Sequence, residues 1–447
     1  MSREAVSHPG IYVRGATTAI TRRTTLRKAF LAPWHELVEQ SWLYSLGDAQ
    51  QHTGVAIHGS NVVIDHHHTE VTAPDGPALV EFTRRVHVDM SKAINTLLSE
   101  LRYDAPGEVW DDRPPHRMRL VDAAAQISHH VYGQLNSTAA GLVARPDQMP
   151  MTALSQRHWK GGPLVIDRPP VMFDPRTRPA QVEVWVSPEP LAFELFDGEL
   201  DALIHHLDRL CERGWRRIRD ARRGRRPMGA KAVRRIHPWN EPRTLRETRG
   251  QPVRTFKVGA QGIVGVRHEI QCAQETTVFR ADHREVRTAR RDGDLERVYP
   301  FGTFAAAAYQ GAPVATAPAP GAILTAPGPT LEEVKAALAE RRGPGGEDAD
   351  GERAAERRRV IDEVGAAFAN EAAEIVAHDD LELCRKVPIG AESSDEAAGA
   401  NGGVQVRHRF DARPTKRSSA ARIVTLRDRR RGRPRRSDKR GDRDPPV

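Results

Sequence analysis

Three consecutive histidines, His66, His67 and His68, lie in the run NVVIDHHHTEVT, whose β-branched residues predict a strand. Successive side chains of a strand point to opposite faces, so His66 and His68 share one face with Glu70, whereas His67 points to the other. Two imidazoles and a carboxylate on one face can bind a divalent metal ion. A His-x-His pair also leaves coordination positions open for water or a phosphate oxygen, as metal-assisted attack on phosphate requires.

A tyrosine and an asparagine, Tyr132 and Asn136, lie four residues apart in a stretch, 120–143, whose apolar residues recur near helical period. Residues at this spacing share one helix face. A phenol with a pKa near about 10 is a poor nucleophile at neutral pH and needs a nearby cation to favour its phenolate form. The pair could therefore join the histidines in one site, although Tyr132 is equally consistent with an ordinary core residue of an amphipathic helix.

The ordered combination of these motifs resembles the REP-associated tyrosine transposases and related one-tyrosine HUH transposases, over about residues 10–154. Members typically have His-hydrophobe-His on a strand and Tyr-x-x-x-Asn-Pro before Gly-Leu-Val on a helix; here the second motif reads YGQLNSTAAGLV. The resemblance implies that His66 and His68 bind Mg or Mn, that Tyr132 is the nucleophile and that Asn136 completes the metal shell. It also implies a ferredoxin-like antiparallel sheet with flanking helices, and cleavage and rejoining of single-stranded or hairpin DNA through a covalent 5′-phosphotyrosine.

The chain departs from the family pattern at two positions. His67 stands where the family has an apolar residue, and Ser137 stands where proline usually follows the asparagine. An alternative to a DNA-nicking transposase is therefore a relative that has lost catalysis and only binds DNA hairpins. A third class is a hydrolase in which His66, His68 and Glu70 hold a metal ion that activates water.

The segments that must position these residues alternate between strand and helix patterns. Apolar spacing predicts strands over 12–21 and over 54–72, the latter as a hairpin turning at residues 59–61, and helices over 33–51, 77–101 and 120–143. Short strands in hairpins between helices favour an α+β fold, with helices packed on an antiparallel sheet. A further strand is expected over 182–190.

A basic helix is predicted over 200–226, and residues 209–235 contain 12 Arg or Lys against two acidic residues, Glu212 and Asp220. Such a density is typical of a surface that binds nucleic-acid phosphates, or of a solvated helix face. The candidate DNA-binding residues in this segment are Arg216, Arg217, Arg222, Arg223, Arg225 and Arg226.

Composition divides the chain into three regions: a transposase-like catalytic domain over 1–160, a basic α/β accessory region over 161–312, and a mostly disordered tail over 313–447. The last 37 residues hold 14 basic and 5 acidic side chains, a net charge of +9 that equals the net charge of the whole chain. Within them, RGRPR resembles an AT-hook core, in which Arg431 and Arg433 would follow a narrow minor groove. A merely solubilising tail is the alternative.

Other classes of protein are disfavoured. Cys211, Cys272 and Cys384 are far apart and form no C-x-x-C pair, which argues against a zinc cage or a disulfide framework and fits the cytoplasm. The longest charge-free stretch, 299–330, is broken by prolines, so no membrane segment is expected. We therefore expect a cytoplasmic protein whose partner is DNA, with a homodimer as a further option.

Overall fold

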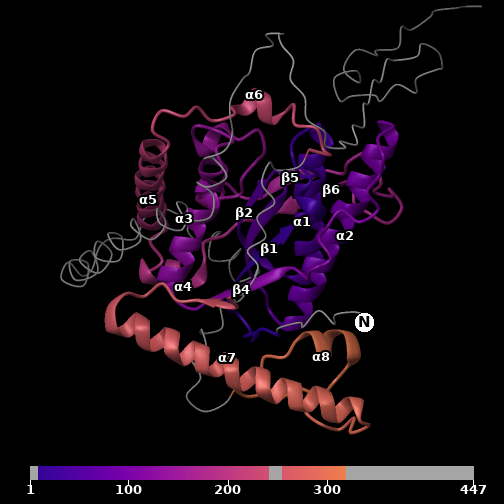
Figure 1. The fold of residues 1–447 in the computed structure, drawn as a ribbon, viewed down its shortest axis with the longest axis vertical. Helices are drawn as coiled ribbons and strands as arrows, with labels where there is room; N and C mark the ends of the chain where they lie inside the picture. Colours follow the sequence, from indigo (N-terminus) through magenta and orange to yellow (C-terminus); the bar gives the residue numbers. More distant parts are fainter. Residues whose placement is uncertain (1–8, 241–253, 319–447) are drawn as a thin grey trace, which may run out of the picture. The chain divides into compact units, whose positions relative to one another are not determined.

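The computed structural model describes residues 9–240 and 254–318. Its centre is a five-stranded sheet in the order β2-β3-β1-β4-β7. Figure 1 labels β1, β2 and β4 of this sheet. The strands are β1 (Thr17–Arg23), β2 (Ala56–Val63), β3 (His66–Thr72), β4 (His116–Leu120) and β7 (Phe256–Lys257). The first four pair antiparallel, and β7 runs parallel to β4. The prediction of an α+β fold built on a sheet with flanking helices is confirmed.

Helices cover both faces of this sheet (Figure 1). The helices α1 (Glu36–Thr53) and α2 (Gly76–Glu100) contact each other on the face toward which His67 points. The helix α3 (Ala123–Ala139) covers the opposite face. Along the chain the order is therefore β1-α1-β2-β3-α2-β4-α3, with the strand that carries the histidines next to the central strand β1.

Local sequence signals explain where these helices begin and end. Asp75 accepts a hydrogen bond from the Ala78 amide at the start of α2, and Asp122 accepts one from the Ala125 amide at the start of α3. Helix α1 ends at Gly54, whose left-handed φ of 65° suits glycine. The expected helices over 33–51 and 77–101 match α1 and α2 within a few residues.

The hairpin that carries the histidines turns later than expected. Val63 pairs with His66, so the turn consists of residues 64 and 65, and the predicted turn residues 59–61 lie inside β2. The register shifts between Ile57 and Gly59, which marks a bulge. A Cβ at Gly59 would lie 2.9 Å from Glu70 Oε2 on the neighbouring strand, so this glycine permits a close approach instead of a turn.

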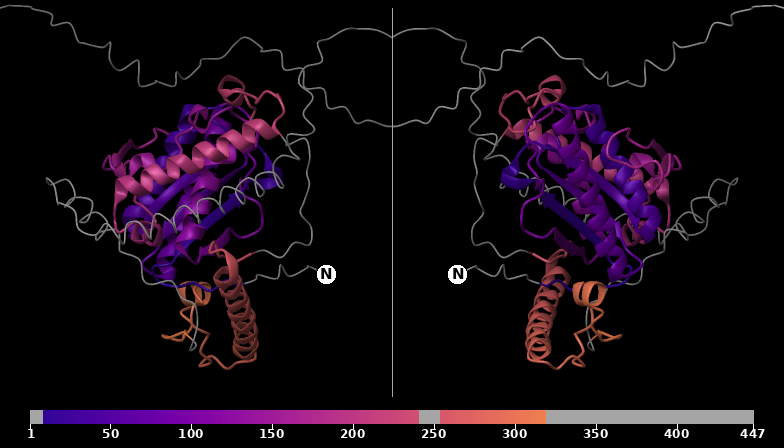
Figure 2. Two further views of the ribbon diagram at one scale, coloured as in Figure 1. Left: turned by 90° about the vertical axis from the view of Figure 1, so that its left-hand side faces the viewer. Right: turned by 90° about the vertical axis from the view of Figure 1, so that its right-hand side faces the viewer.

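Residues 164–240 add a second group of elements: a two-stranded sheet of β5 (Leu164–Asp167) and β6 (Gln181–Val184), and the helices α4 (Pro190–Leu195), α5 (Leu200–Ala221) and α6 (Ala230–Val233). Before this segment, short 3-10 helices occupy Thr25–Arg27, Pro146–Gln148 and Gln156–His158. Helix α5 contacts α3, and Figure 2 (left) shows α5 on the side of the molecule that α3 covers. Gly214 of α5 makes room for the side chain of Leu135.

One hydrophobic core draws on residues from both sides of position 160. It contains Ile20, Trp42 and Ile127 together with Val184 and Leu207, all at most 2% exposed. The two outer strands of the antiparallel part of the sheet, β2 and β4, are also contacted by later parts of the chain. Bridges join Ser60 to Leu154 and Ile57 to Val186 at the β2 edge, and β7 pairs with β4 at the other. The division into regions 1–160 and 161–312 stays a prediction.

Other elements differ from the sequence patterns. The stretch predicted as one helix, 120–143, begins one residue inside β4 and is helical only over α3. The predicted basic helix over 200–226 ends at residue 221. Residues 262–310 form α7 (Gly262–Arg291) and α8 (Ala305–Gln310), and an ion pair of 3.6 Å between Arg119 and Glu275 joins α7 to β4. Most of the tail predicted to be disordered, 319–447, lies outside the described residues.

Candidate metal and nucleophile site

His66 and His68 point to the sheet face that α3 covers, as the strand alternation predicts. Their ring centroids lie 5.0 Å apart at an interplanar angle of 87°. Both residues are buried, at 8% and 9% exposed. The two imidazoles therefore form a protected pair at the start of β3.

One ring nitrogen of each histidine is already bonded. Nδ1 of His66 lies 2.7 Å from Oδ1 of Asp65, whose other oxygen accepts a 2.8 Å hydrogen bond from Arg27. Nδ1 of His68 lies 3.0 Å from Oγ1 of Thr21 on β1. Hydrogen bonds at Nδ1 orient a histidine so that Nε2 can bind a metal ion. Nε2 of His68 is buried and has no hydrogen-bond partner among the described residues.

Charge effects favour the ligating form of His68. Burial, reinforced by the neighbouring imidazoles and by Arg23, lowers the pKa of His68 well below its usual value. Burial by itself would raise the pKa of Asp65, but the charges and hydrogen bonds of His66 and Arg27 outweigh it and lower that pKa, so the carboxylate is held ionised. The neutral imidazole of His68 and the ionised carboxylate that orients the His66 ring both suit metal binding.

Helix α3 brings Tyr132 and Asn136 to the histidine pair. Nδ2 of Asn136 lies 3.3 Å from Nε2 of His66, and its Oδ1 is buried without a hydrogen-bond partner in the described part of the chain. The Tyr132 ring lies 5.3 Å from the His68 ring, at 86°. Tyr132 is only partly buried, whereas Asn136 is fully buried. Four residues predicted from two distant motifs are thus brought together.

The residues of this site fit a divalent metal ion. Nε2 of His68 and Oδ1 of Asn136 are buried atoms that have no hydrogen-bond partner among residues 9–240 and 254–318, and Nε2 of His66 faces the same amide. A rotation of that amide by 180° would present its oxygen to the imidazoles. Two imidazoles and one oxygen suit Mn better than Mg, because Mg prefers oxygen ligands throughout.

Glu70 belongs to a different group. Its Oε2 lies 2.8 Å from Nδ1 of His130, which is also 2.8 Å from Oε1 of Glu189. All three side chains are buried, and their ligand atoms lie within 4.8 Å of one another, so this group could itself hold a metal ion. Glu70 therefore shares the face of His66 and His68 but contacts His130 instead of completing their site.

His129 lies between the two groups. Its ring is 6.2 Å from that of His68 and 5.8 Å from that of Tyr132, and its Nε2 is 3.9 Å from Oε1 of Glu70. Burial, followed by the charge of Lys257, lowers the pKa of His129 to about 3. His129 and His130 were not among the predicted residues, although His129 stands one helical turn before Tyr132, a spacing that could have revealed it.

His67, on the opposite face, is held in a chain of hydrogen bonds. Its ring lies against Trp42, and its Nε2 is 2.9 Å from Nε2 of His87, whose Nδ1 is 3.1 Å from the Arg22 guanidinium. Arg22 can only donate, so Nδ1 of His87 accepts, and the hydrogen of that ring lies on Nε2, which donates to Nε2 of His67. The hydrogen of His67 must then lie on Nδ1, which donates to Oγ1 of Thr69, 3.0 Å away. Burial lowers the pKa of His67 to about 3. The unusual histidine is thus a satisfied, neutral core residue.

The predicted DNA-binding arginines have different surroundings. Arg222 is buried, and its guanidinium donates to the carbonyl oxygens of Thr138 and Val143 near the C-terminal end of α3. Arg216 is paired with Glu212 at 3.0 Å. Arg217, Arg223, Arg225 and Arg226 are exposed. The guanidinium groups of Arg145 and Arg219 lie over the ring of Trp215 on α5, at 4.3 and 5.2 Å from its centroid. Arg431 and Arg433 lie outside the described residues.

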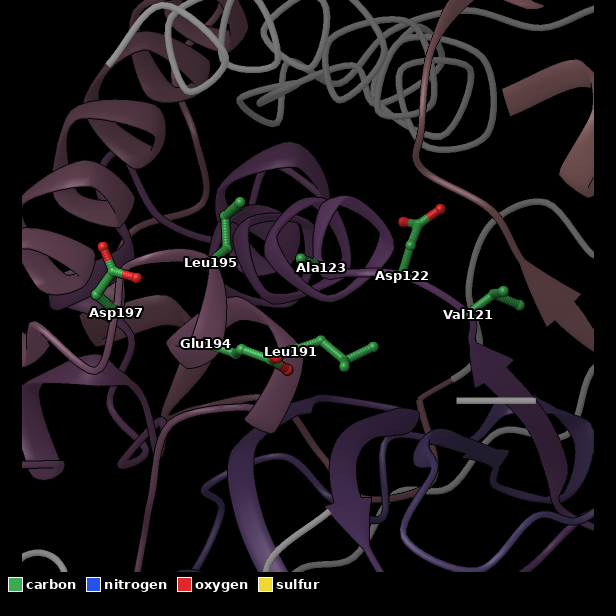
Figure 3. Close-up of a pocket in the computed structure, with 7 residues that line it drawn as sticks. All are labelled: Val121, Asp122, Ala123, Leu191, Glu194, Leu195 and Asp197. Carbon is green, nitrogen blue, oxygen red and sulfur yellow. The ribbon is translucent and has the colours of Figure 1, made fainter. Parts of the chain in front are cut away.

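A pocket lies at the start of α3, away from this site (Figure 3). It is lined by Val121, Asp122, Ala123, Leu191, Glu194, Leu195 and Asp197. Tyr132 is ten residues further along α3 than Asp122, about 15 Å at 1.5 Å per residue. Three carboxylates in the lining disfavour a polyanionic ligand there. In the described part of the chain, no helix is both long enough and apolar enough to cross a membrane.

Comparisons with known proteins give little further information. No family model matches the chain, and no curated protein matches it. Among solved structures, a REP-associated tyrosine transposase bound to a REP hairpin is similar, with 16% sequence identity and a TM-score of 0.25. The match covers 33% of this chain and 81% of that one. Similarity at this level does not establish a shared fold or activity.

Proposed function

We propose that this protein is a metal-dependent DNA-nicking transposase that cleaves and rejoins single-stranded or hairpin DNA through a covalent bond to Tyr132. The observation that carries the proposal is the convergence of Tyr132 and Asn136 on the His66–His68 pair, with a 5.3 Å separation of the Tyr132 and His68 rings. The β-α-β-β-α-β order from β1 to β4, counting strands and α-helices, supports the expected ferredoxin-like sheet of such enzymes.

The chemistry follows from these residue types. Oη of Tyr132 attacks the scissile phosphorus, the bond from phosphorus to the 3′ oxygen breaks, and that oxygen leaves as a 3′-hydroxyl after taking up a proton. A bound divalent ion supplies positive charge that favours phenolate and neutralises the phosphate. The 5′-phosphotyrosine conserves one phosphodiester for a later 3′-hydroxyl to attack, so the same residues perform rejoining by the reverse steps.

His66, His68 and Asn136 would hold the ion, with Mn as the preferred species. Asp65 and Thr21 orient the two imidazoles through Nδ1. The contact of Glu70 with His130 argues against Glu70 as a ligand of this ion, and so against the alternative of a water-activating hydrolase built on His66, His68 and Glu70.

Positive charges near the site would bind the DNA backbone. Arg23 on β1 lies opposite His66 on the neighbouring strand β3, and the charge of Lys257 helps to lower the pKa of His129. The exposed arginines Arg217, Arg223, Arg225 and Arg226 extend the basic surface along and beyond α5, and Trp215 could stack with a base only if its cationic neighbours moved. Contact of Arg431 and Arg433 with a minor groove, and association of two chains, stay predictions.

The test is incubation of the full-length protein with circular single-stranded DNA rich in hairpins, in the presence of Mn or Mg. A denaturing gel should show a protein–DNA adduct that requires the ion and is lost in Tyr132→Phe. The matched control is Tyr103→Phe, since Tyr103 is exposed and its ring lies against His237 instead of the histidines of the site. Nicking that survives Tyr132→Phe would indicate hydrolysis by water. Hairpin binding without cleavage would identify a relative that only binds DNA.

A further inference from the structure

We propose that a second divalent transition-metal ion, separate from the one at His66 and His68, binds Glu70, His130 and Glu189. The three ligands come from β3, from α3 and from the residue that precedes α4. Their side chains are between 0% and 6% exposed. This inference does not depend on the proposed DNA chemistry.

Too few hydrogens are present for the acceptors in this group. Nδ1 of His130 lies 2.8 Å from Oε2 of Glu70 and 2.8 Å from Oε1 of Glu189, yet it carries at most one hydrogen. Both oxygens of Glu189 and the Oε1 of Glu70 are buried without a hydrogen-bond partner among the described residues. Nε2 of His129, 3.9 Å from Oε1 of Glu70, is likewise unpartnered. Buried acceptors of this kind require a cation or a proton between them.

The second nitrogen of His130 indicates which form the ring takes. Gln156 donates from its Nε2 to Asp208, at 2.9 Å, so its Oε1 faces Nε2 of His130 at 3.0 Å and must accept a hydrogen bond. His130 therefore carries its hydrogen on Nε2, and Nδ1 is left to bind a metal ion. A hydrogen bond from the non-ligating nitrogen to an oxygen is the usual arrangement for a metal-binding histidine.

The spacing and the donor types also suit an ion. Neighbouring ligands at about 2.1 Å from a metal lie about 3 Å apart when their bonds are at right angles, close to the 2.8 Å found here. One imidazole and two carboxylates favour Mn(II) or Zn(II) over Ca(II) or Mg(II). Gly59 keeps the space open, because a Cβ there would lie 2.9 Å from Oε2 of Glu70 and 3.3 Å from Nδ1 of His130.

Such an ion would fix α3 against β3. His130 precedes Tyr132 by two residues, and Glu70 follows His68 by two, so one ion would tie the helix that carries the nucleophile to the strand that carries the first metal site. The competing arrangement replaces the ion with protons. In that case burial lowers the pKa of His130, but the charges of Glu189 and Glu70 outweigh burial and raise this pKa well above its usual value. Burial raises the pKa of Glu70 to about 7.

Metal stoichiometry decides between these arrangements. The full-length protein is equilibrated with Mn(II), and in parallel with Zn(II), and bound metal is measured by ultrafiltration and elemental analysis. We expect two ions per chain in the wild type, one in Glu189→Gln and one in the double variant His66→Ala/His68→Ala. Glu194→Gln, the same change at an exposed position of α4, should keep two.

One ion in the wild type that is kept in Glu189→Gln and lost in the double variant would overturn the inference, as would no bound ion at all. Circular dichroism checks that each variant is folded. Should Glu189→Gln not fold, the double variant decides, because it leaves Glu70, His130 and Glu189 intact: one remaining ion supports the second site and none overturns it. Two bound ions without any adduct at Tyr132 would retain this site while removing the proposed function.

Discussion

Nδ1 of His66 and Oδ1 of Asp65 lie 2.7 Å apart although the two residues are neighbours in sequence, at the point where the β2–β3 hairpin turns. Asp65 is held in place by Arg27, at 2.8 Å. The same turn that sets the hairpin register therefore supplies the carboxylate that orients the first histidine of the candidate metal site.

Replacement of this carboxylate should weaken metal binding. In Asp65→Asn the amide keeps the shape but loses the negative charge that supports His66, and changes of this kind typically reduce metal affinity about 10–100-fold. Titration calorimetry with Mn(II) measures the change, with Asp174→Asn, at a half-buried aspartate that is likewise paired with an arginine, as the control. Unchanged affinity in Asp65→Asn would show that His66 does not bind the ion.

Two arginines close in sequence should have opposite phenotypes. Arg222→Ala removes the donor to the Thr138 and Val143 carbonyls, of which Thr138 still accepts from the Gly141 amide, so the free energy of unfolding should fall by about 1–3 kcal/mol. Arg226→Ala, at an exposed position, should leave stability unchanged but weaken DNA binding, and it should reduce the salt dependence of log K by about one unit of slope. Urea denaturation and DNA binding at several salt concentrations measure both effects. The reverse pattern would place the DNA elsewhere.

Stability should fall as the pH is lowered through the range of the buried histidines. His67 has a folded-state pKa of about 3 against the ordinary 6.5, so below about pH 6.5 the unfolded state binds a proton that the folded state does not. The free energy of unfolding should therefore decrease from about pH 6.5 towards pH 3, with a contribution from His67 on the order of a few kcal/mol.

The variant His67→Gln isolates this contribution. Glutamine can accept from His87 and donate to Thr69 as His67 does, but it does not titrate. Urea denaturation at a series of pH values should show a slope smaller by about one proton than in the wild type. An identical pH slope in both proteins would mean that His67 is protonated equally in the folded and unfolded states.

Two helical glycines should respond differently to alanine. A Cβ at Gly214 would collide with the Leu135 side chain, and overpacking of this kind costs about 1–3 kcal/mol. No atom outside its own helix lies within 4 Å of a Cβ at Gly133 of α3, so Gly133→Ala should be neutral or stabilise by up to about 1 kcal/mol. Thermal unfolding of the two variants compares them directly. Equal effects would show that α3 and α5 do not contact each other as closely as described.

The residues that converge at the candidate site follow from simple periodicities. Alternation along a strand places His66 and His68 on one face, and the four-residue spacing places Tyr132 and Asn136 on one side of a helix. What the sequence could not indicate was that Glu70, on that same face, turns to His130 and Glu189. Glu189 is more than 100 residues away from Glu70 in sequence and has no motif around it.

The parts of the fold that escaped prediction depend on contacts between distant segments. Strand β4 lies in a stretch interrupted by prolines, and β7 has only two residues, so both are defined by their partners in the sheet instead of by their own sequence. Gly59 resembles a turn residue because glycine is common in turns, yet its role is to admit Glu70 and His130. Local patterns do not distinguish these uses of glycine.

The contacts at β2 and β4, the outer strands of the antiparallel part of the sheet, have a consequence for fragments of this protein. Strand β2 is bridged by residues 154 and 186, and β4 is paired with residues 256 and 257. A chain cut at residue 160 would keep every residue of the histidine and tyrosine motifs. It would lose Val186 and β7, which contact the sheet, and core residues such as Val184 and Leu207. Its exposed strand edges would be templates for pairing with other chains, so the short fragment should aggregate.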